Sequence, residues 1–181
     1  MLSQMADSWT FENLSSYPNV RLAPETGTTF EENAAIKAVS ASHQIKGSHI
    51  LADDSGIEVD ALGGAPGVWS ARFAGENADD EANRSKLLRE LQNVSGPEER
   101  SARFCCVMVV ARDGEVVATV RGEVEGTLTL EERGDGGFGY DPIFIPDGYD
   151  RTFAELSAEE KNSISHRARA LMQIADRLQT V

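Results

Sequence analysis

The sequence predicts an α/β fold in which helices flank a central mixed sheet. Three observations support this prediction: helical spacing near both ends of the chain, strand-like apolar runs in the middle, and no regular alternation of strand and helix between them. The chain has 181 residues. We therefore expect a single domain over residues 1–181.

A helix is predicted over residues 30–46. Thr28 and Glu31 stand three residues apart like a capping box, and Gly47 stands where a helix would stop. The apolar residues of this segment have the spacing of a buried stripe: Phe30, Ala34, Ala38, Ala41 and Ile45.

Strands are predicted in the middle of the chain. An apolar run over 49–52 leads into Asp53-Asp54-Ser55-Gly56, and residues 57–61 alternate as a half-exposed strand does. The run Phe104–Ala111 predicts a buried strand. Asp113-Gly114 predicts a hairpin turn to a partner strand, whose pairing continues over 121–130.

Two further helices are predicted downstream. One covers residues 79–92, and Pro97 blocks its continuation. The other covers 158–178, with Ser157 and Glu160 as its capping pair. Its apolar stripe consists of Ile164, Ala168, Leu171, Ala175 and Leu178.

Composition and charge exclude several classes of protein. Seventeen basic and thirty acidic side chains give a net charge of −13, which repels nucleic acid and anionic lipid. The longest apolar run is far shorter than the roughly 20 residues that span a membrane, and the first residues do not form a signal peptide. The only cysteines, Cys105 and Cys106, are adjacent and point to opposite faces of a strand, which excludes a disulfide framework. We expect a cytoplasmic protein with no nucleic-acid or membrane partner.

Two acidic segments are candidates for chemistry. The neighbouring carboxylates of Asp53 and Asp54 repel each other, and Mg²⁺ would offset that repulsion while binding substrate phosphates. An ordinary turn explains Asp53-Asp54-Ser55-Gly56 as well. Glu31-Glu32-Asn33 begins a helix, where favourable interaction with the helix dipole is explanation enough.

Two other segments carry aromatic, glycine or basic residues. In 134–141, glycines allow close approach to a phosphate and the rings of Phe138 and Tyr140 allow stacking on a base, although a hairpin loop packed on the core is equally consistent. On one unbroken helix, Lys161 and Arg167 would flank the buried stripe while His166 would point away from it. Either the helix restarts near Ser165, or one of the three is not a ligand; a solvated basic face is the alternative.

Taken together, these segments resemble the inosine triphosphate pyrophosphatases, which hydrolyse deaminated purine nucleotides such as dITP and XTP. The matching stretches occur in the family's order from Thr28 to the C-terminus: 29–34, 51–56, 61–67, 70–75, 136–142, 152–156, and 160–162 through 165–167.

The resemblance implies an elongated central sheet, two lobes around a nucleotide cleft, and a homodimer. It also implies Asp54 as the catalytic base, and Glu32 with Asp54 as the ligands of Mg²⁺. The residues that it implies for substrate binding are Ser55, Phe138, Gly139, Tyr140, Asp141, Lys161, His166 and Arg167.

The sequence departs from the family pattern at its start. Family members open with a strand that leads into Thr-x-x-Asn-x-x-Lys, whose Asn and Lys hold the triphosphate, whereas here 1–4 stand about where that lysine belongs. We therefore expect a domain that lacks the first strand. One alternative function is a nucleotide-binding protein with little or no turnover, and another is a pyrophosphatase for pyrimidine or modified nucleotides.

Overall fold

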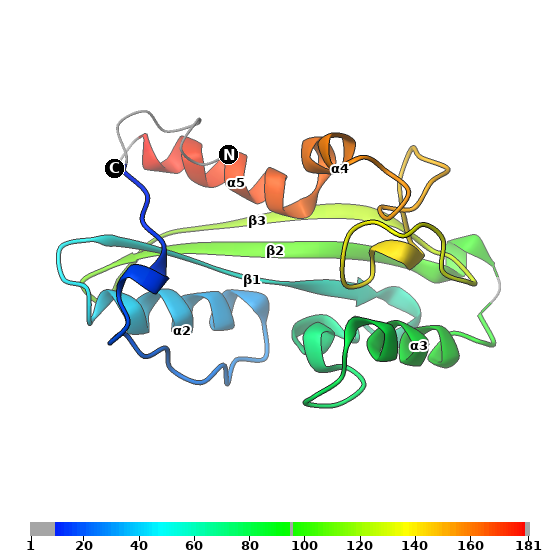
Figure 1. Cartoon of the computed structure of the whole chain (residues 1–181), viewed down its shortest axis with the longest axis horizontal. Coiled ribbons are helices and arrows are strands. Elements are labelled where there is room, and N and C mark those ends of the chain that lie inside the picture. Colours follow the sequence, from blue (N-terminus) through cyan, green and yellow to red (C-terminus); the bar gives the residue numbers. More distant parts are fainter. Residues whose placement is uncertain (1–9, 95, 180–181) are drawn as a thin grey trace. The chain divides into compact units, whose positions relative to one another are not determined.

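The computed structural model describes residues 10–94 and 96–179. Four strands form one sheet in the order β1-β2-β3-β4. Figure 1 labels the first three of them. The strands are β1 (His49–Val59), β2 (Ser101–Arg112), β3 (Glu115–Leu128) and β4 (Phe144–Pro146). The α-helices are α2 (Phe30–Ser42), α3 (Asp80–Glu90), α4 (Ala158–Ile164) and α5 (His166–Leu178).

The predicted fold class, a sheet flanked by helices, is confirmed. The pairing differs in one respect, because the four strands are antiparallel rather than mixed. Along β4, for example, Gly126 lies opposite Pro146 and Leu128 opposite Phe144. The hairpin explains the β2–β3 pairing, since a two-residue turn can join only antiparallel strands.

The chain divides into two compact units. The first contains residues up to 54, 106–122 and those from 167 onward; the second contains 55–105 and 123–166. Strands β1, β2 and β3 therefore contribute to both. In the first unit, α2 and α5 lie on opposite faces of the sheet (Figure 1). The prediction of a single domain stays a prediction, and the predicted lack of a first strand concerns residues that lie outside the described ones.

The N-cap of helix α2 lies one residue later than predicted. Thr29, not Thr28, is the N-cap, and its hydroxyl accepts the backbone N–H of Glu32 at 3.1 Å. Both Thr-Glu pairs have the correct spacing, so the sequence could not choose between them. The helix ends at Ser42 rather than Lys46.

Strand β1 runs without interruption from His49 to Val59. The turn considered for Asp53-Asp54-Ser55-Gly56 is therefore wrong, because these residues are extended. They lie in the sheet, so that successive side chains point to opposite faces.

Strand β2 is buried on both faces. Cys105 and Cys106 have no exposed surface, and neither forms a disulfide in the described part of the chain, in line with the prediction. The following turn has positive φ at Asp113 (53°) and Gly114 (96°), the backbone conformation of the predicted hairpin.

The predicted C-terminal helix is two helices. The capping box of Ser157 and Glu160 is confirmed at the start of α4. Ser165 is extended (ψ 153°), and α5 begins directly after it. This confirms the predicted alternative that the helix restarts near Ser165, and it corrects the direction expected of His166 on an unbroken helix. The break changes the helical phase, so His166 is buried.

Within the described residues, none of the helices is long and apolar enough to cross a bilayer.

Candidate active site

The carboxylate of Asp54 lies at the junction of β1 and α2 in the first unit. Lys37 donates from Nζ to its Oδ1 at 2.9 Å, and Asn33 donates from Nδ2 to its Oδ2 at 3.3 Å. The side chain of Asp54 is 13% exposed. This carboxylate is therefore fixed at both oxygens and still open to solvent on one side.

Sequence reasoning missed Asn33 and Lys37 as functional residues. They stand four residues apart, so they project from the same side of α2. Asn33 is also fully buried, and its Oδ1 accepts the backbone N–H of Gly27 at 2.8 Å. The signal available in the sequence was a polar pair that interrupts the apolar stripe of this helix.

The electrostatic environment of Asp54 is a balance of opposing effects. Burial raises the pKa of this carboxyl, while the hydrogen bonds and charge of Lys37 and the bond from Asn33 lower it; the net pKa is above that of a free aspartate. Glu25 contributes in the same direction as burial, and it lies 3.6 Å from Lys37. An aspartate with a raised pKa is suited to accept a proton near neutral pH.

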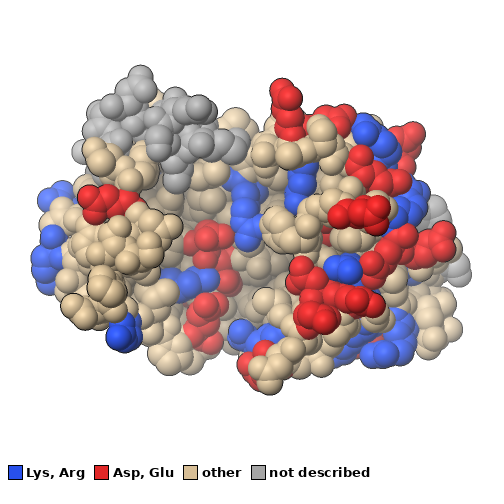
Figure 2. Space-filling view, in the orientation of Figure 1, with Lys and Arg blue, Asp and Glu red and all other residues tan. Residues whose placement is uncertain are grey.

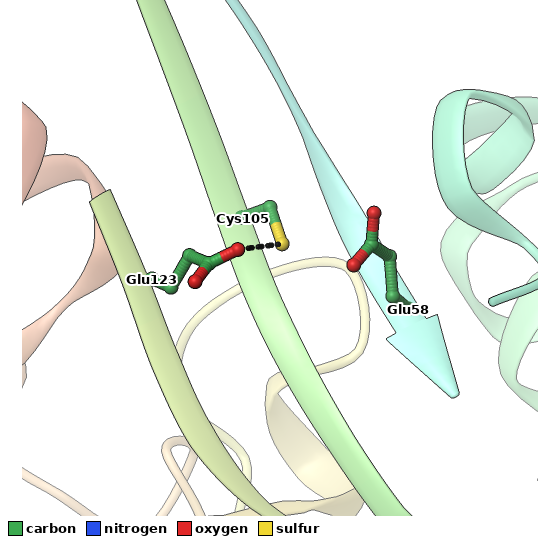
Figure 3. Close-up of side chains that lie close together, drawn as sticks. All are labelled: Glu58, Cys105 and Glu123. Atoms are coloured by element: carbon green, nitrogen blue, oxygen red, sulfur yellow. Dashed lines mark hydrogen bonds between the residues drawn. The ribbon is translucent and has the colours of Figure 1, made fainter. Parts of the chain in front are cut away.

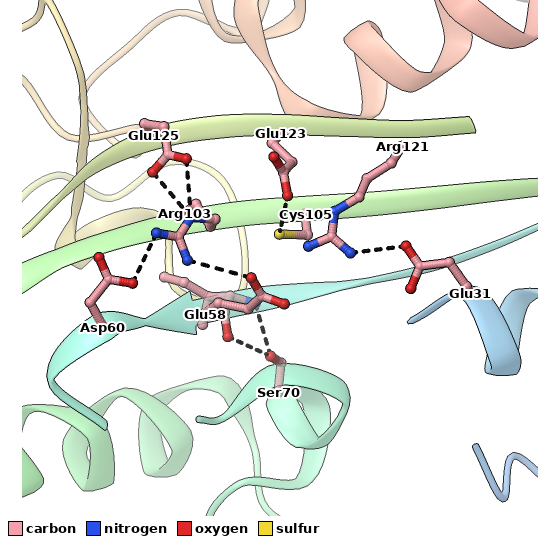
Figure 4. A network of polar contacts seen from close by, with 10 residues as sticks. Glu31, Glu58, Asp60, Ser70, Arg103, Cys105, Arg121, Glu123 and Glu125 are labelled. Atoms are coloured by element: carbon pink, nitrogen blue, oxygen red, sulfur yellow. Dashed lines mark hydrogen bonds and ion pairs between the residues drawn. The ribbon is translucent and has the colours of Figure 1, made fainter. Parts of the chain in front are cut away.

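Glu32, the second predicted metal ligand, belongs to the capping box of α2. Its Oε2 accepts the backbone N–H groups of Thr28 at 2.6 Å and Thr29 at 3.3 Å, which lowers the pKa of this carboxyl. Its neighbour Glu31 instead pairs with Arg121 of β3 at 3.0 Å (Figure 4). The hydrogen bonds to Glu32 thus favour its ionised form, and Glu31 has a structural partner.

The predicted nucleotide loop, residues 138–141, lies in the second unit. Phe138 is 59% exposed, whereas Tyr140 and Asp141 are buried. The hydroxyl of Tyr140 donates to the carbonyl of Ser70 at 2.8 Å. Burial of this residue raises the pKa of its phenol. Phe138 therefore offers a ring face to solvent, and Tyr140 anchors the loop to the core.

Asp141 and Lys161 form a close ion pair beneath this loop. Asp141 also accepts the backbone N–H of Phe138 at 2.8 Å, and the ammonium group of Lys161 lies 4.4 Å from the centre of the Phe138 ring. Gly137 shows how tight this packing is, because a Cβ built there would lie 2.1 Å from the Asp141 carboxylate. Lys161 is therefore held at the loop, with its charge shared with Asp141.

The remaining predicted contacts are distributed over both units. His166 stacks on Phe104 with ring centres 4.9 Å apart, in the core of the second unit. Arg167 lies in the first unit with its Nε 3.6 Å from Oδ2 of Asp53. Ser55 directly follows Asp54 in β1. Arg167 is the more accessible of the two residues that begin α5.

A separate group of potential metal ligands lies on the sheet of the second unit. Glu58, Cys105 and Glu123, from three neighbouring strands, offer ligand atoms within 4.8 Å of one another (Figure 3). Cys105 donates from Sγ to Glu123 at 3.5 Å. Arg103 pairs with three carboxylates (Figure 4): Glu58, Asp60 and Glu125. Arg103 offsets part of this negative charge, and the group belongs to a polar network on the sheet.

A cavity of about 480 Å³ lies in the first unit, between α2, β1 and the segment that begins at Thr10. Lys37 and Asp53 are among its few charged residues, and most of its lining is apolar. Such a lining does not suit phosphate or a metal ion. On the face shown in Figure 2, acidic and basic side chains are interspersed, so this face presents no single large patch of either sign.

Comparison with known proteins supports the resemblance found in the sequence. The family model described as the Ham1 family matches residues 1–177. A dITP/XTP pyrophosphatase of Bacillus licheniformis is 55% identical over 151 residues, which are 83% of this chain and 76% of the relative. A dITP/XTP pyrophosphatase of Bacillus subtilis is 52% identical over 155 residues, 86% of this chain and 77% of the relative.

The solved structures agree with these sequence matches. The Staphylococcus aureus Ham1 protein superposes with a TM-score of 0.89 at 40% identity, covering 98% of this chain and 91% of that chain. The similarity in fold therefore extends over nearly the whole length of both chains.

Proposed function

Because the chain belongs to the Ham1 family, we propose that it hydrolyses deaminated purine nucleoside triphosphates, such as dITP, ITP and XTP, to the monophosphate and pyrophosphate. The observation that carries this proposal is the Asp54 carboxylate, partly exposed and held by Lys37 and Asn33. Removal of such nucleotides from the pool is the corresponding cellular role.

The reaction is an attack of water on the α-phosphorus. The oxygen of water forms a bond to this phosphorus, the bond to the bridging oxygen of the β-phosphate breaks, and pyrophosphate leaves with the electron pair. Asp54 accepts the proton of the attacking water. Lys37 and Lys161 supply positive charge, which a protein of net charge −13 needs locally for a polyphosphate substrate.

Two carboxylates, Glu32 and Asp54, would hold Mg²⁺. The donor set fits a hard cation, which binds through one or two carboxylates plus substrate phosphates. Both carboxylates belong to the region around the first turn of α2: Glu32 lies in that turn, and its neighbour Asn33 bonds Asp54. The lowered pKa of Glu32 favours the charged form that a metal ligand needs. When bound, the metal would neutralise phosphate charge and orient the leaving pyrophosphate.

Metal dependence has a direct test. We expect pyrophosphate release to stop in EDTA and to return when Mg²⁺ is added in excess. Glu32→Gln should raise the Mg²⁺ concentration needed for half-maximal activity, and Glu31→Gln is the matched control because Glu31 pairs with Arg121 instead. Full turnover in metal-free buffer would remove Glu32 and Asp54 from the ligand role.

Each unit offers candidate contacts for the base: the loop in the second unit and the start of α5 in the first. The exposed ring of Phe138 offers a stacking surface for the purine, and Arg167 or a backbone N–H near His166 offers a donor to its 6-oxo group. Adenine presents an amino group at that position, so donor would face donor. Deaminated bases should therefore be preferred.

One assay tests the substrate class. Pyrophosphate release is measured from ITP, XTP, dATP and dTTP with Mg²⁺, next to a binding titration of each nucleotide. We expect the highest kcat/KM for ITP and XTP. Faster hydrolysis of dTTP would favour a pyrimidine pyrophosphatase, and tight binding with no pyrophosphate released would favour a binding protein.

We further propose a homodimer in the cytoplasm. The resemblance to the inosine triphosphate pyrophosphatases supports the homodimer. The two buried thiols, which form no disulfide in the described residues, are compatible with a reducing compartment. Light scattering of the purified chain measures the mass directly, and a monomer at micromolar concentration would contradict the dimer.

A further inference from the structure

Helix α3 holds the peptide groups on both sides of Gly139. The backbone N–H of Gly139 donates to Oδ2 of Asp80 at 2.7 Å, and its carbonyl accepts from Nη1 of Arg84 at 2.8 Å. Asp80 and Arg84 stand one turn apart, so both side chains leave the same side of the helix. All three residues belong to the second unit.

The two bonds fix the backbone torsions of Gly139. Its N–H belongs to the peptide group before the Cα atom, and its carbonyl belongs to the peptide group after it. Holding both groups therefore sets φ and ψ of this one residue. The φ of Gly139 is +60°, although a Cβ there would meet no atom within 4 Å. The glycine is needed for this conformation rather than for space.

Asp80 and Arg84, which we call the clamp, are themselves held in place. Arg84 is largely buried, with its Nε 2.9 Å from Oε1 of Glu132. Its guanidinium group therefore contacts both Glu132 and the carbonyl of Gly139. Asp80 lies in the first turn of α3, where the helix dipole favours a negative charge. A carboxylate and a guanidinium group in these positions make charge-assisted bonds, which are stronger than neutral ones.

We propose that Asp80 and Arg84 are positioning residues that fix the nucleotide loop of residues 138–141, and thereby determine the affinity for the base. The proposal rests on the proposed function, since it assumes that Phe138 stacks on the purine. Gly139 directly follows Phe138, so its torsions decide where the exposed ring lies. Neither Asp80 nor Arg84 needs to touch the substrate.

The test compares two clamp variants with two control variants of the same helix. Asp80→Ala and Arg84→Ala each remove one bond to Gly139. Glu81→Gln and Arg89→Ala change charges of α3 at exposed positions. Asp80→Asn keeps an oxygen that can accept the Gly139 N–H. The measurements are KM and kcat for ITP, the melting temperature, and amide hydrogen exchange at Gly139 and Tyr140.

We expect KM to rise about tenfold in Asp80→Ala and Arg84→Ala, the loss typical of one charge-assisted hydrogen bond, with kcat within about twofold of the unmodified protein. Exchange at Gly139 should become faster in Asp80→Ala. In Asp80→Asn, both KM and the exchange rate at Gly139 should be close to those of the unmodified protein. KM values equal to those of Glu81→Gln and Arg89→Ala would overturn the proposal. A lower melting temperature with unchanged KM and unchanged exchange at Gly139 would also overturn it.

The proposed function can fail separately. If the unmodified protein hydrolyses no nucleotide, the proposed reaction is wrong. Hydrogen exchange at Gly139 then tests the positioning role of Asp80 without reference to activity. Faster exchange in Asp80→Ala than in Glu81→Gln supports that role, and equal exchange in the two variants overturns it.

Discussion

Each unit of the molecule contains an aspartate paired with a lysine, and the two pairs have different surroundings. In the first unit, Asp54 takes its bonds from the side chains of Lys37 and Asn33, and its side chain is 13% exposed. In the second, Asp141 pairs with Lys161 and also accepts a backbone N–H, and its side chain is 2% exposed.

The comparison shows that two ion pairs of the same residue types can differ in role because their aspartates differ in burial. Asp141 satisfies a backbone donor inside a folded loop, so its removal would leave the Phe138 N–H and the partly exposed ammonium group of Lys161 without this acceptor. Among the described residues, Asp54 is bonded by side chains alone, and 13% of its side chain is exposed, so a substrate or metal can reach it. We therefore regard Asp141–Lys161 as the pair that holds the loop, and Asp54–Lys37 as the pair that performs chemistry.

The largest expected effect is that of Asp54→Asn on turnover. Loss of a general base typically costs roughly 10²–10⁴-fold in kcat, and we expect a decrease in this range for ITP with little change in melting temperature. Asp53→Asn is the matched control, because adjacent strand residues face opposite sides of the sheet. A more active Asp54→Asn than Asp53→Asn would show that the assignment along β1 is off by one residue.

Asp141→Asn should show the reverse pattern, a large effect on stability and a smaller one on kcat. Breaking a buried ion pair costs on the order of 3 kcal/mol, which corresponds to roughly 6–12 °C in melting temperature for a chain of this size. KM should rise as well, because the loop is loosened. Asp147→Asn, an exposed aspartate after β4, is the control. An unchanged melting temperature would contradict the holding role of Asp141.

Lys37→Met should have the smallest effect on kcat/KM, and it should move the pH profile in a defined direction. Lys37 lowers the pKa of Asp54 against the effect of burial, so its removal raises that pKa further. The acidic limb of the kcat/KM profile for ITP should then move to higher pH. At neutral pH we expect a decrease of about fivefold, as for an ion pair worth up to about 1 kcal/mol.

The control for this variant is Lys46→Met, because Lys46 is an exposed lysine in the turn after α2. Its profile should match that of the unmodified protein. An acidic limb in Lys37→Met that stays in place or moves to lower pH would show that Lys37 does not act on the ionisation of Asp54.

The sequence predicted most elements of the fold because their signals are local. Capping at Ser157, the hairpin turn at Asp113-Gly114 and the apolar stripes each depend on residues within a few positions of one another. One error arose where two local patterns were equally good. Thr28 and Thr29 each precede a glutamate by three residues, and only the folded helix selects Thr29.

The sequence by itself determined the fold class, the buried double-cysteine strand, the family resemblance and the segments that carry the candidate site. Only the tertiary structure decided the partners of those segments. Asn33 and Lys37 reach Asp54 from 21 and 17 positions away, and Arg84 reaches Gly139 from 55. A backbone pattern that repeats every two or four residues contains no information about such pairs, because they depend on which helix packs against which strand or loop.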